Sequence, residues 1–210
     1  IRADADMTLA GAILAGGAGS RMQPSNVPKP LLEIAGRPLL AYVIERLEGR
    51  VHPLLINSPP HEGFERFGLP LAPDLRPERL GPLAGMEAVH ARLSTGYPQP
   101  AHILFAPADA PFLPDDFVSR MTRSSGRVRI ARSGGRLHPT ASLWPMDALS
   151  GLGAYLETPG CRRSVLDYAH LQGFDVEDFP AGRGIDPFFN VNRPADLDIA
   201  NAHLTPPPAQ

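Results

Sequence analysis

The sequence contains one cysteine, Cys161, among its 210 residues. A single thiol cannot form an internal disulfide, and it cannot supply the paired cysteines of a structural zinc site. We therefore expect a cytoplasmic protein. The sequence also lacks an apolar run of roughly 20 residues, the length that spans a bilayer, and no signal-peptide pattern precedes Met7. These absences predict a soluble protein with no membrane partner.

An excess of charge of either sign is also missing. The chain carries 20 Lys and Arg against 22 Asp and Glu, a formal net charge of −2. Proteins that bind nucleic acid usually present a strongly basic surface. We therefore expect no nucleic-acid partner, and an anionic ligand must be met by local arginine and lysine side chains.

Proline and glycine are plentiful, at 25 and 20 residues, but they fall between apolar runs and form no low-complexity block. Hydrophobic residues make up 43% of the chain, which is enough to bury a core. We predict one domain over residues 8–204. Residues 1–7 are interpreted as a disordered extension or one foreign to the native chain, and the proline-rich residues 205–210 as a disordered tail.

Short apolar runs alternate with segments of helical periodicity. Strands are predicted at residues 9–14, 52–56, 69–72, 103–106, 128–132, 143–144 and 174–179, and helices at 38–47, 61–67, 83–93, 116–122, 147–156 and 164–171. The alternation favours an α/β fold: a single three-layer domain whose mostly parallel sheet has helices on both faces. We predict that residues 174–179 form an edge strand with its charges facing outward, and that a short strand in residues 188–197 leads into a terminal helix.

The first strand runs into a glycine-rich loop, Gly16-Gly17-Ala18-Gly19, which Arg21 and Lys29 follow. Glycines let backbone N–H groups wrap around an anion, and the two cations could neutralise phosphate charge. The spacing matches neither a Walker P-loop nor a dinucleotide-binding fingerprint. The alternative is a β-turn beside a solvated arginine and lysine.

Further candidates lie at the ends of later elements. Asp109 follows the strand at residues 103–106, where open α/β sheets bind ligands, and could hold Mg²⁺ against phosphate oxygens; a turn or N-cap aspartate is the alternative. Gly81 and Gly85 begin the helix at residues 83–93, where free N–H groups favour anions. Tight packing of that helix on the sheet would explain these glycines equally well.

Taken together, these segments resemble a known superfamily. Residues 14–22, LAGGAGSRM, and 28–40, PKPLLEIAGRPLL, are similar to nucleotidyltransferases that join a nucleoside triphosphate to a phosphorylated acceptor. In that superfamily the glycine loop holds the triphosphate and the base, and the arginine and lysine after it neutralise phosphate charge. The resemblance therefore implies catalytic roles for Arg21 and Lys29, together with Asp109.

Later strings look most like the molybdenum cofactor guanylyltransferases: Asp74 with residues 81–85, GPLAG; residues 106–113, APADAPFL; residues 136–140, RLHPT; Arg162-Arg163; and residues 188–197, FFNVNRPADL. The resemblance implies a set of nucleotide contacts. These are Leu14, Ala15, Gly16, Gly17, Lys29, Asn57, Asp74, Gly81, Gly85 and Asp109, with Asp109 also the metal ligand.

The implied reaction is transfer of GMP from GTP to molybdopterin, or its molybdenum-loaded form, with release of pyrophosphate and Mg²⁺ as the cofactor. A molybdenum-insertion protein and apo-molybdoenzymes would be its protein partners. Two alternatives remain: a cytidylyl- or sugar-1-phosphate nucleotidyltransferase, and a non-catalytic GTP-dependent adaptor that delivers the cofactor.

A pterin phosphate needs a cationic partner for its phosphate and amide groups for its ring heteroatoms. We predict that the residues supplying these chemistries form the acceptor site, although each also has a structural interpretation as a packed histidine, a solvated cap or an amide pair that fixes the last helix. They are His138, Arg162, Arg163, Asn190 and Asn192.

The sequence departs from the guanylyltransferase pattern at three places. Residues 23–27, QPSNV, replace the usual glycines and aspartate before the lysine, Ala108 stands where a cysteine is common, and Pro59 replaces a second asparagine after Asn57. The first and third bear on nucleobase choice and acceptor contacts, whereas Lys29 and Asp109 are retained.

Overall fold

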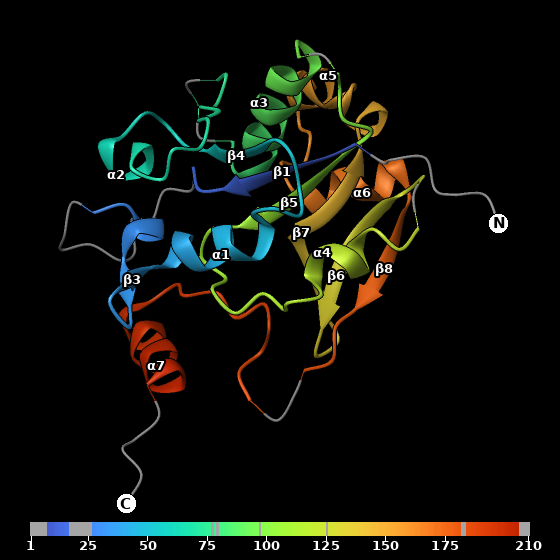
Figure 1. Ribbon diagram of the computed structural model, residues 1–210. Coiled ribbons are helices and arrows are strands. Elements are labelled where there is room, and N and C mark those ends of the chain that lie inside the picture. Colours follow the sequence, from blue (N-terminus) through green and yellow to red (C-terminus); the bar gives the residue numbers. More distant parts are fainter. Residues whose placement is uncertain are drawn as a thin grey trace, which may run out of the picture.

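The computed structural model describes residues 8–16, 27–76, 78, 80–96, 98–124, 126–181 and 184–205. Six strands form one sheet, in the order β4 (Leu54–Asn57), β1 (Leu9–Leu14), β5 (His102–Pro107), β7 (Arg136–Pro145), β6 (Val128–Ser133) and β8 (Phe174–Asp178) (Figure 1). Only β7 runs against its neighbours; the other pairings are parallel. The predicted mostly parallel α/β sheet is confirmed.

Helices cover both faces of this sheet (Figure 1). The core on one face contains residues of α3 (Pro82–Ser94), α5 (Leu152–Glu157) and α6 (Val165–Gln172), and the core on the other contains residues of α1 (Leu39–Leu47) and α4 (Phe117–Met121). Because side chains alternate along a strand, β1 supplies Ala10 and Ala12 to the first core and Ile13 to the second. A strand with both faces buried has to be apolar throughout, which explains the run LAGAIL.

The smaller elements extend this framework. They are the 3₁₀ helices η1 (Lys29–Leu31) and η2 (Asp147–Leu149), the short helix α2 (Glu62–Glu65), the ribbon of β2 (Glu33–Ile34) and β3 (Arg37–Pro38), and the final helix α7 (Pro194–Leu204). A third core joins this ribbon to α7 through Ile34, Val191 and Ala200. In the described part of the chain, no helix combines the length and apolarity needed to cross a membrane.

Three predicted elements differ from those observed. Residues 69–72 contribute only one bridge, between Leu71 and Ile56. The helix predicted at 147–156 is interrupted, and Gly151 is the N-cap of α5 after η2 ends. Residues 188–192 form no strand. Backbone N–H groups within them bond to Asp186 and Asp109 and not to a neighbouring strand.

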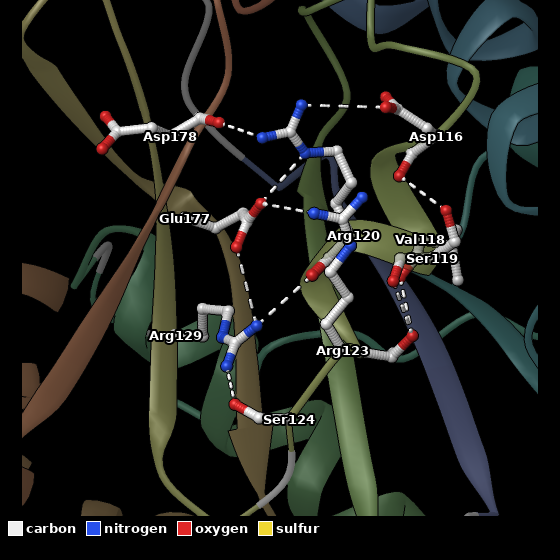
Figure 2. Close-up of polar contacts among 10 residues, drawn as sticks. Asp116, Val118, Ser119, Arg120, Arg123, Ser124, Arg129, Glu177 and Asp178 are labelled. Atoms are coloured by element: carbon white, nitrogen blue, oxygen red, sulfur yellow. Dashed lines mark hydrogen bonds and ion pairs between the residues drawn. The ribbon is translucent and has the colours of Figure 1, made fainter.

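The prediction that β8 turns its charges outward is wrong for Glu177. Its carboxylate contacts Arg120 of α4 at 2.9 Å and Arg129 of β6 at 3.7 Å, and its side chain is 15% exposed (Figure 2). Asp178, by contrast, is exposed and pairs with Arg132. Glu177 therefore faces the helix-covered side of the sheet, where its ion pair with Arg120 links the edge strand β8 to α4.

Candidate active site at the carboxyl ends of the parallel strands

Three parallel strands end in one row. The register aligns Leu14 of β1 with Asn57 of β4 and with Pro107 of β5, and the row continues as Ala15 N–H donates to the Asn57 carbonyl at 2.9 Å. Asp109 follows Pro107 by two residues. The apolar strands thus deliver Gly16, an amide and a carboxylate to one edge of the sheet, where ligands bind in open α/β folds.

Lys29 and Asp109 meet directly at this edge. Their ammonium and carboxylate form an ion pair in which the two side chains are 13% and 21% exposed. The same ammonium donates to Asn192 Oδ1 at 2.7 Å, and the Asp109 carbonyl accepts the Val191 N–H at 2.9 Å. Residues from three distant parts of the sequence therefore converge on one cation and one anion.

Asn57 is held rigidly beside them. Its side-chain amide donates to the Ala72 carbonyl at 2.9 Å and to Asp74 Oδ1 at 2.8 Å, so both amide hydrogens are used. A Cβ placed on Gly85 would lie 2.1 Å from Asn57 Oδ1, and one on Gly16 would lie 3.2 Å from it. Gly85 requires glycine because a side chain there would displace the buried amide, and a side chain on Gly16 would press against it.

The residues around these contacts enclose a cavity of about 420 Å³. Many of the predicted site residues line it, as does the N-terminus of α3, where Gly81 is the N-cap with φ of 74°, a left-handed conformation that suits glycine. The lining comprises Leu14, Ala15, Gly16, Lys29, Pro30, Asn57, Asp74, Gly81, Pro82, Pro107, Ala108, Asp109, Thr140 and Asn190.

Several predicted residues lie outside this lining. Gly85 sits behind Asn57, and Asn192 reaches the cavity through Lys29. The side chain of Arg162 is 83% exposed and lies 3.7 Å from Asp167. The Arg163 carbonyl lies 4.0 Å from the Cβ position of Gly81, so the segment carrying both arginines borders the cavity without lining it.

The structure places His138 outside the cavity as well. Its Nε2 lies 2.8 Å from Ser133 Oγ, and its ring stacks on Phe188 with a centroid separation of 4.6 Å. Burial lowers the pKa of His138 below the ordinary histidine value, and the nearby Asp186 carboxylate only partly opposes this. Arg21 and Gly17 fall outside the described residues, so the structure does not test their predicted roles.

Thr140 is a cavity residue that sequence reasoning did not single out. Ala131 pairs with His138 while the preceding Ile130 pairs with Ser142, so residues 139–141 form a bulge in β7. Bulges commonly redirect side chains beside functional sites. The available signal was Pro139, since proline inside a strand sequence often marks a bulge.

Arg76 is a second residue that the sequence did not reveal. Its guanidinium makes two bonds to Glu87 of α3, at 2.8 and 2.7 Å, and these bonds raise its pKa above the usual value. The contact ties the segment after Asp74 to α3. No periodicity surrounds Arg76, so only the folded structure shows this link.

A larger cavity of about 590 Å³ lies among residues of α1, α4 and α7. It contains none of the predicted site residues, and each of its arginines already has a carboxylate partner within 3 Å. These pairs are Arg37 with Glu45, Arg46 with Asp115, and Arg120 with Glu177. The smaller cavity is the better candidate because its polar groups converge at the strand ends.

Comparison with known proteins identifies the family of the chain. The family model of the MobA-like NTP transferase domain matches residues 11–173. A molybdenum cofactor guanylyltransferase from Rhizobium meliloti (strain 1021) is 36% identical over 200 residues, covering 91% of this chain and 90% of that protein.

Solved structures share the fold. Molybdopterin-guanine dinucleotide biosynthesis protein A from Archaeoglobus fulgidus has a TM-score of 0.68 at 18% identity, covering 91% of this chain and 96% of that one. A 4-diphosphocytidyl-2C-methyl-D-erythritol synthase from Anaerococcus prevotii has a TM-score of 0.67 at 11% identity, covering 93% and 97%. Because these two are named for different nucleotides, the fold alone does not select the base.

Proposed function

The chain belongs to the MobA-like NTP transferase family and is a nucleotidyltransferase, and from that premise we propose that it transfers GMP from GTP to molybdopterin. The product would be the guanine dinucleotide form of the cofactor, and pyrophosphate would leave. Support for this acceptor and this base comes from relatives with about 36% identity over nine-tenths of the chain that are named molybdenum cofactor guanylyltransferases.

The observation that carries the proposal is the ion pair of Lys29 and Asp109 in the cavity, where Lys29 is also bonded to Asn192. A nucleotidyltransferase needs a cation for phosphate oxygens and a carboxylate that can hold a metal beside them. Both groups lie where three parallel strands end, in a cavity that Gly16 also lines, and this arrangement matches that requirement. It also places an amide from the C-terminal segment on the same lysine.

The nucleotide side of the cavity would comprise residues 14–16, Asn57, Asp74 and the N-terminus of α3. Backbone N–H groups and the positive end of the helix dipole favour phosphate there. Guanine presents donors at N1 and N2 and an acceptor at O6, which backbone groups of residues 14–16 could match. Asn57 offers only its oxygen, because both of its amide hydrogens are engaged.

The acceptor side would lie toward Asn190 and Thr140. Within the described part of the chain, Asn190 Oδ1 is buried without a hydrogen-bond partner, although the residue lines the cavity. An unsatisfied buried acceptor is costly, and an N–H group of a pterin ring would satisfy it. Arg162 and Arg163, on the bordering segment, remain our candidates for the acceptor phosphate.

In the proposed reaction an oxygen of the molybdopterin phosphate attacks the α-phosphorus of GTP. The new oxygen–phosphorus bond forms as the bond from the α-phosphorus to the oxygen bridging to the β-phosphorus breaks, and pyrophosphate carries that electron pair away. No covalent enzyme intermediate is required. Lys29 would neutralise phosphate charge while the cavity walls align the two substrates, so catalysis rests on positioning and electrostatics.

Mg²⁺ fits this site as a substrate-held ion. The described residues contain no cluster of three or more His, Cys, Asp or Glu side chains suited to a metal, but Mg²⁺ commonly binds through one or two carboxylates together with substrate phosphates. Asp109 would hold it. When bound, the ion would withdraw charge from phosphate oxygens.

The test is pyrophosphate release from each of the four ribonucleoside triphosphates, with and without molybdopterin. We expect release that depends on both GTP and molybdopterin. A preference for CTP, or for a sugar 1-phosphate as acceptor, would move the assignment to another nucleotidyltransferase. Binding of GTP without pyrophosphate release would instead indicate a delivery adaptor.

A further inference from the structure

A partly buried hydrogen-bond cluster lies behind the acceptor side of the cavity. It joins Ser133 at the end of β6, His138 in β7 and Asp186 in the segment after β8. The Ser133 hydroxyl, in a residue that is 2% exposed, lies 2.8 Å from both Asp186 carboxylate oxygens and 2.8 Å from His138 Nε2.

Hydrogen counting fixes the direction of these bonds. A hydroxyl has one hydrogen, and an ionised carboxylate can only accept, so Ser133 donates to Asp186. The Ser133 oxygen must then accept from His138, which places a proton on Nε2. A neutral imidazole with its proton on Nε2 satisfies this arrangement, and the lowered pKa of His138 agrees with it.

One end of the cluster holds the segment that carries Asn190 and Asn192. Asp186 Oδ1 also accepts the Phe188 N–H at 2.7 Å. Phe188 is 2% exposed and stacks on the His138 ring. From this anchor the chain continues through Asn190 to Val191, whose N–H reaches the Asp109 carbonyl, and then to Asn192 on Lys29.

The other end holds the bulge that carries Thr140. His138 is the last residue paired with β6 before residues 139–141 leave the ladder, and pairing resumes at Ser142. Ser142 Oγ closes the bulge by donating to the Pro139 carbonyl at 2.7 Å. The cluster therefore lies at the base of both segments that supply acceptor-side residues to the cavity.

We propose that Ser133, His138 and Asp186 are positioning residues that set the acceptor side of the cavity without touching the substrate. This inference rests on the proposed function. The nucleotide side depends on separate contacts, those of Asn57 with Asp74 and of Arg76 with Glu87. A fault in the cluster should therefore affect the acceptor more strongly than the nucleotide.

Two substitutions at one position separate the hydrogen bond from the side-chain volume. His138→Leu removes the donor, whereas His138→Gln keeps an N–H near the place of Nε2. We expect His138→Leu to raise KM for molybdopterin about tenfold or more, since misplacing a substrate by about 1 Å can cost 100-fold, and to raise KM for GTP far less. His138→Gln should recover most of the loss.

His90→Leu is the matched control because His90 is also half-buried with a pKa lowered by burial, but it lies on α3 away from the cavity lining. It should leave both KM values unchanged. If His138→Leu raises both KM values equally while lowering the melting temperature, or if His138→Gln is as impaired as His138→Leu, the positioning role is overturned. Ser133→Ala, a smaller change, provides the same test if His138→Leu fails to fold.

Amide hydrogen exchange of ligand-free protein gives a readout independent of activity. We expect Ser133→Ala and His138→Leu to accelerate exchange in residues 186–192, with residues 54–57 unchanged. If wild-type protein proves inactive with GTP and molybdopterin, the proposed function fails, and exchange still tests the positioning role. Unchanged exchange in residues 186–192 would refute that role whatever the activity.

Discussion

Replacing Gly85 by alanine sets a gain in helix stability against damage to the nucleotide site. Alanine in a helix interior is favoured over glycine by about 1 kcal/mol. The new Cβ, however, would lie 2.1 Å from Asn57 Oδ1 and 2.6 Å from Asn57 Cγ, closer than packed atoms can approach. Asn57 is 3% exposed, so its side chain cannot escape to solvent without leaving its partners.

Displacing Asn57 would break its bonds to the Ala72 carbonyl and to Asp74. Each such bond contributes about 0.5–1.5 kcal/mol to stability, so the loss of two would exceed or cancel the helical gain. We therefore expect Gly85→Ala to change the free energy of unfolding by no more than about 2 kcal/mol. The affinity for GTP should fall by roughly 10- to 100-fold, which corresponds to about 1.4–2.8 kcal/mol.

Calorimetric titration with GTP on Gly85→Ala, Asn57→Ala and the double variant tests this reasoning. If Gly85→Ala acts by displacing Asn57, the double variant should bind GTP no more weakly than Asn57→Ala alone. Fully additive losses, or a Gly85→Ala affinity within twofold of wild type, would refute the explanation.

Three further predictions concern the metal carboxylate, the edge strand and pH. Asp109→Asn should lower Mg²⁺-dependent pyrophosphate release by about 10²- to 10³-fold while the protein remains folded; turnover within threefold would show that Asp109 is not required. Glu177→Gln should lower the free energy of unfolding by about 1.5–3 kcal/mol, because two inward-facing arginines lose their shared carboxylate, and urea titration showing no loss would contradict this. Burial lowers the folded-state pKa values of His90, His102 and His138 from 6.5, so the unfolded chain takes up more protons and stability should fall as pH drops below about 6.5; equal urea midpoints at pH 7.5 and 5.5 would count against it.

Local pattern was sufficient for the elements that carry the nucleotide side. The apolar run of β1, the apolar run before Asp109 and the helix after Gly81 were predicted close to their observed bounds. Each is apolar enough to be recognised without knowledge of its neighbours. Because open α/β sheets bind ligands at the carboxyl ends of their strands, the sequence also indicated that Asp109 would face a ligand site, and it lines the cavity.

The acceptor side depends on contacts between distant segments, which no local pattern reveals. A short strand was predicted around Asn190, but the Val191 N–H donates instead to the Asp109 carbonyl. Thr140 enters the cavity only because the two strands of the hairpin change register. The inward orientation of Glu177 also depends on distant residues, because its carboxylate pairs with Arg120 and Arg129.

The most direct test of guanylyl transfer follows the two ends of the triphosphate separately. Purified protein is incubated with molybdopterin, Mg²⁺ and GTP labelled at either the α- or the γ-phosphate, and the products are separated. The account predicts that the α-label enters a molybdopterin guanine dinucleotide while the γ-label appears in pyrophosphate. An α-label found only in free GMP, or a γ-label released as inorganic phosphate, would show hydrolysis and contradict the proposed transfer.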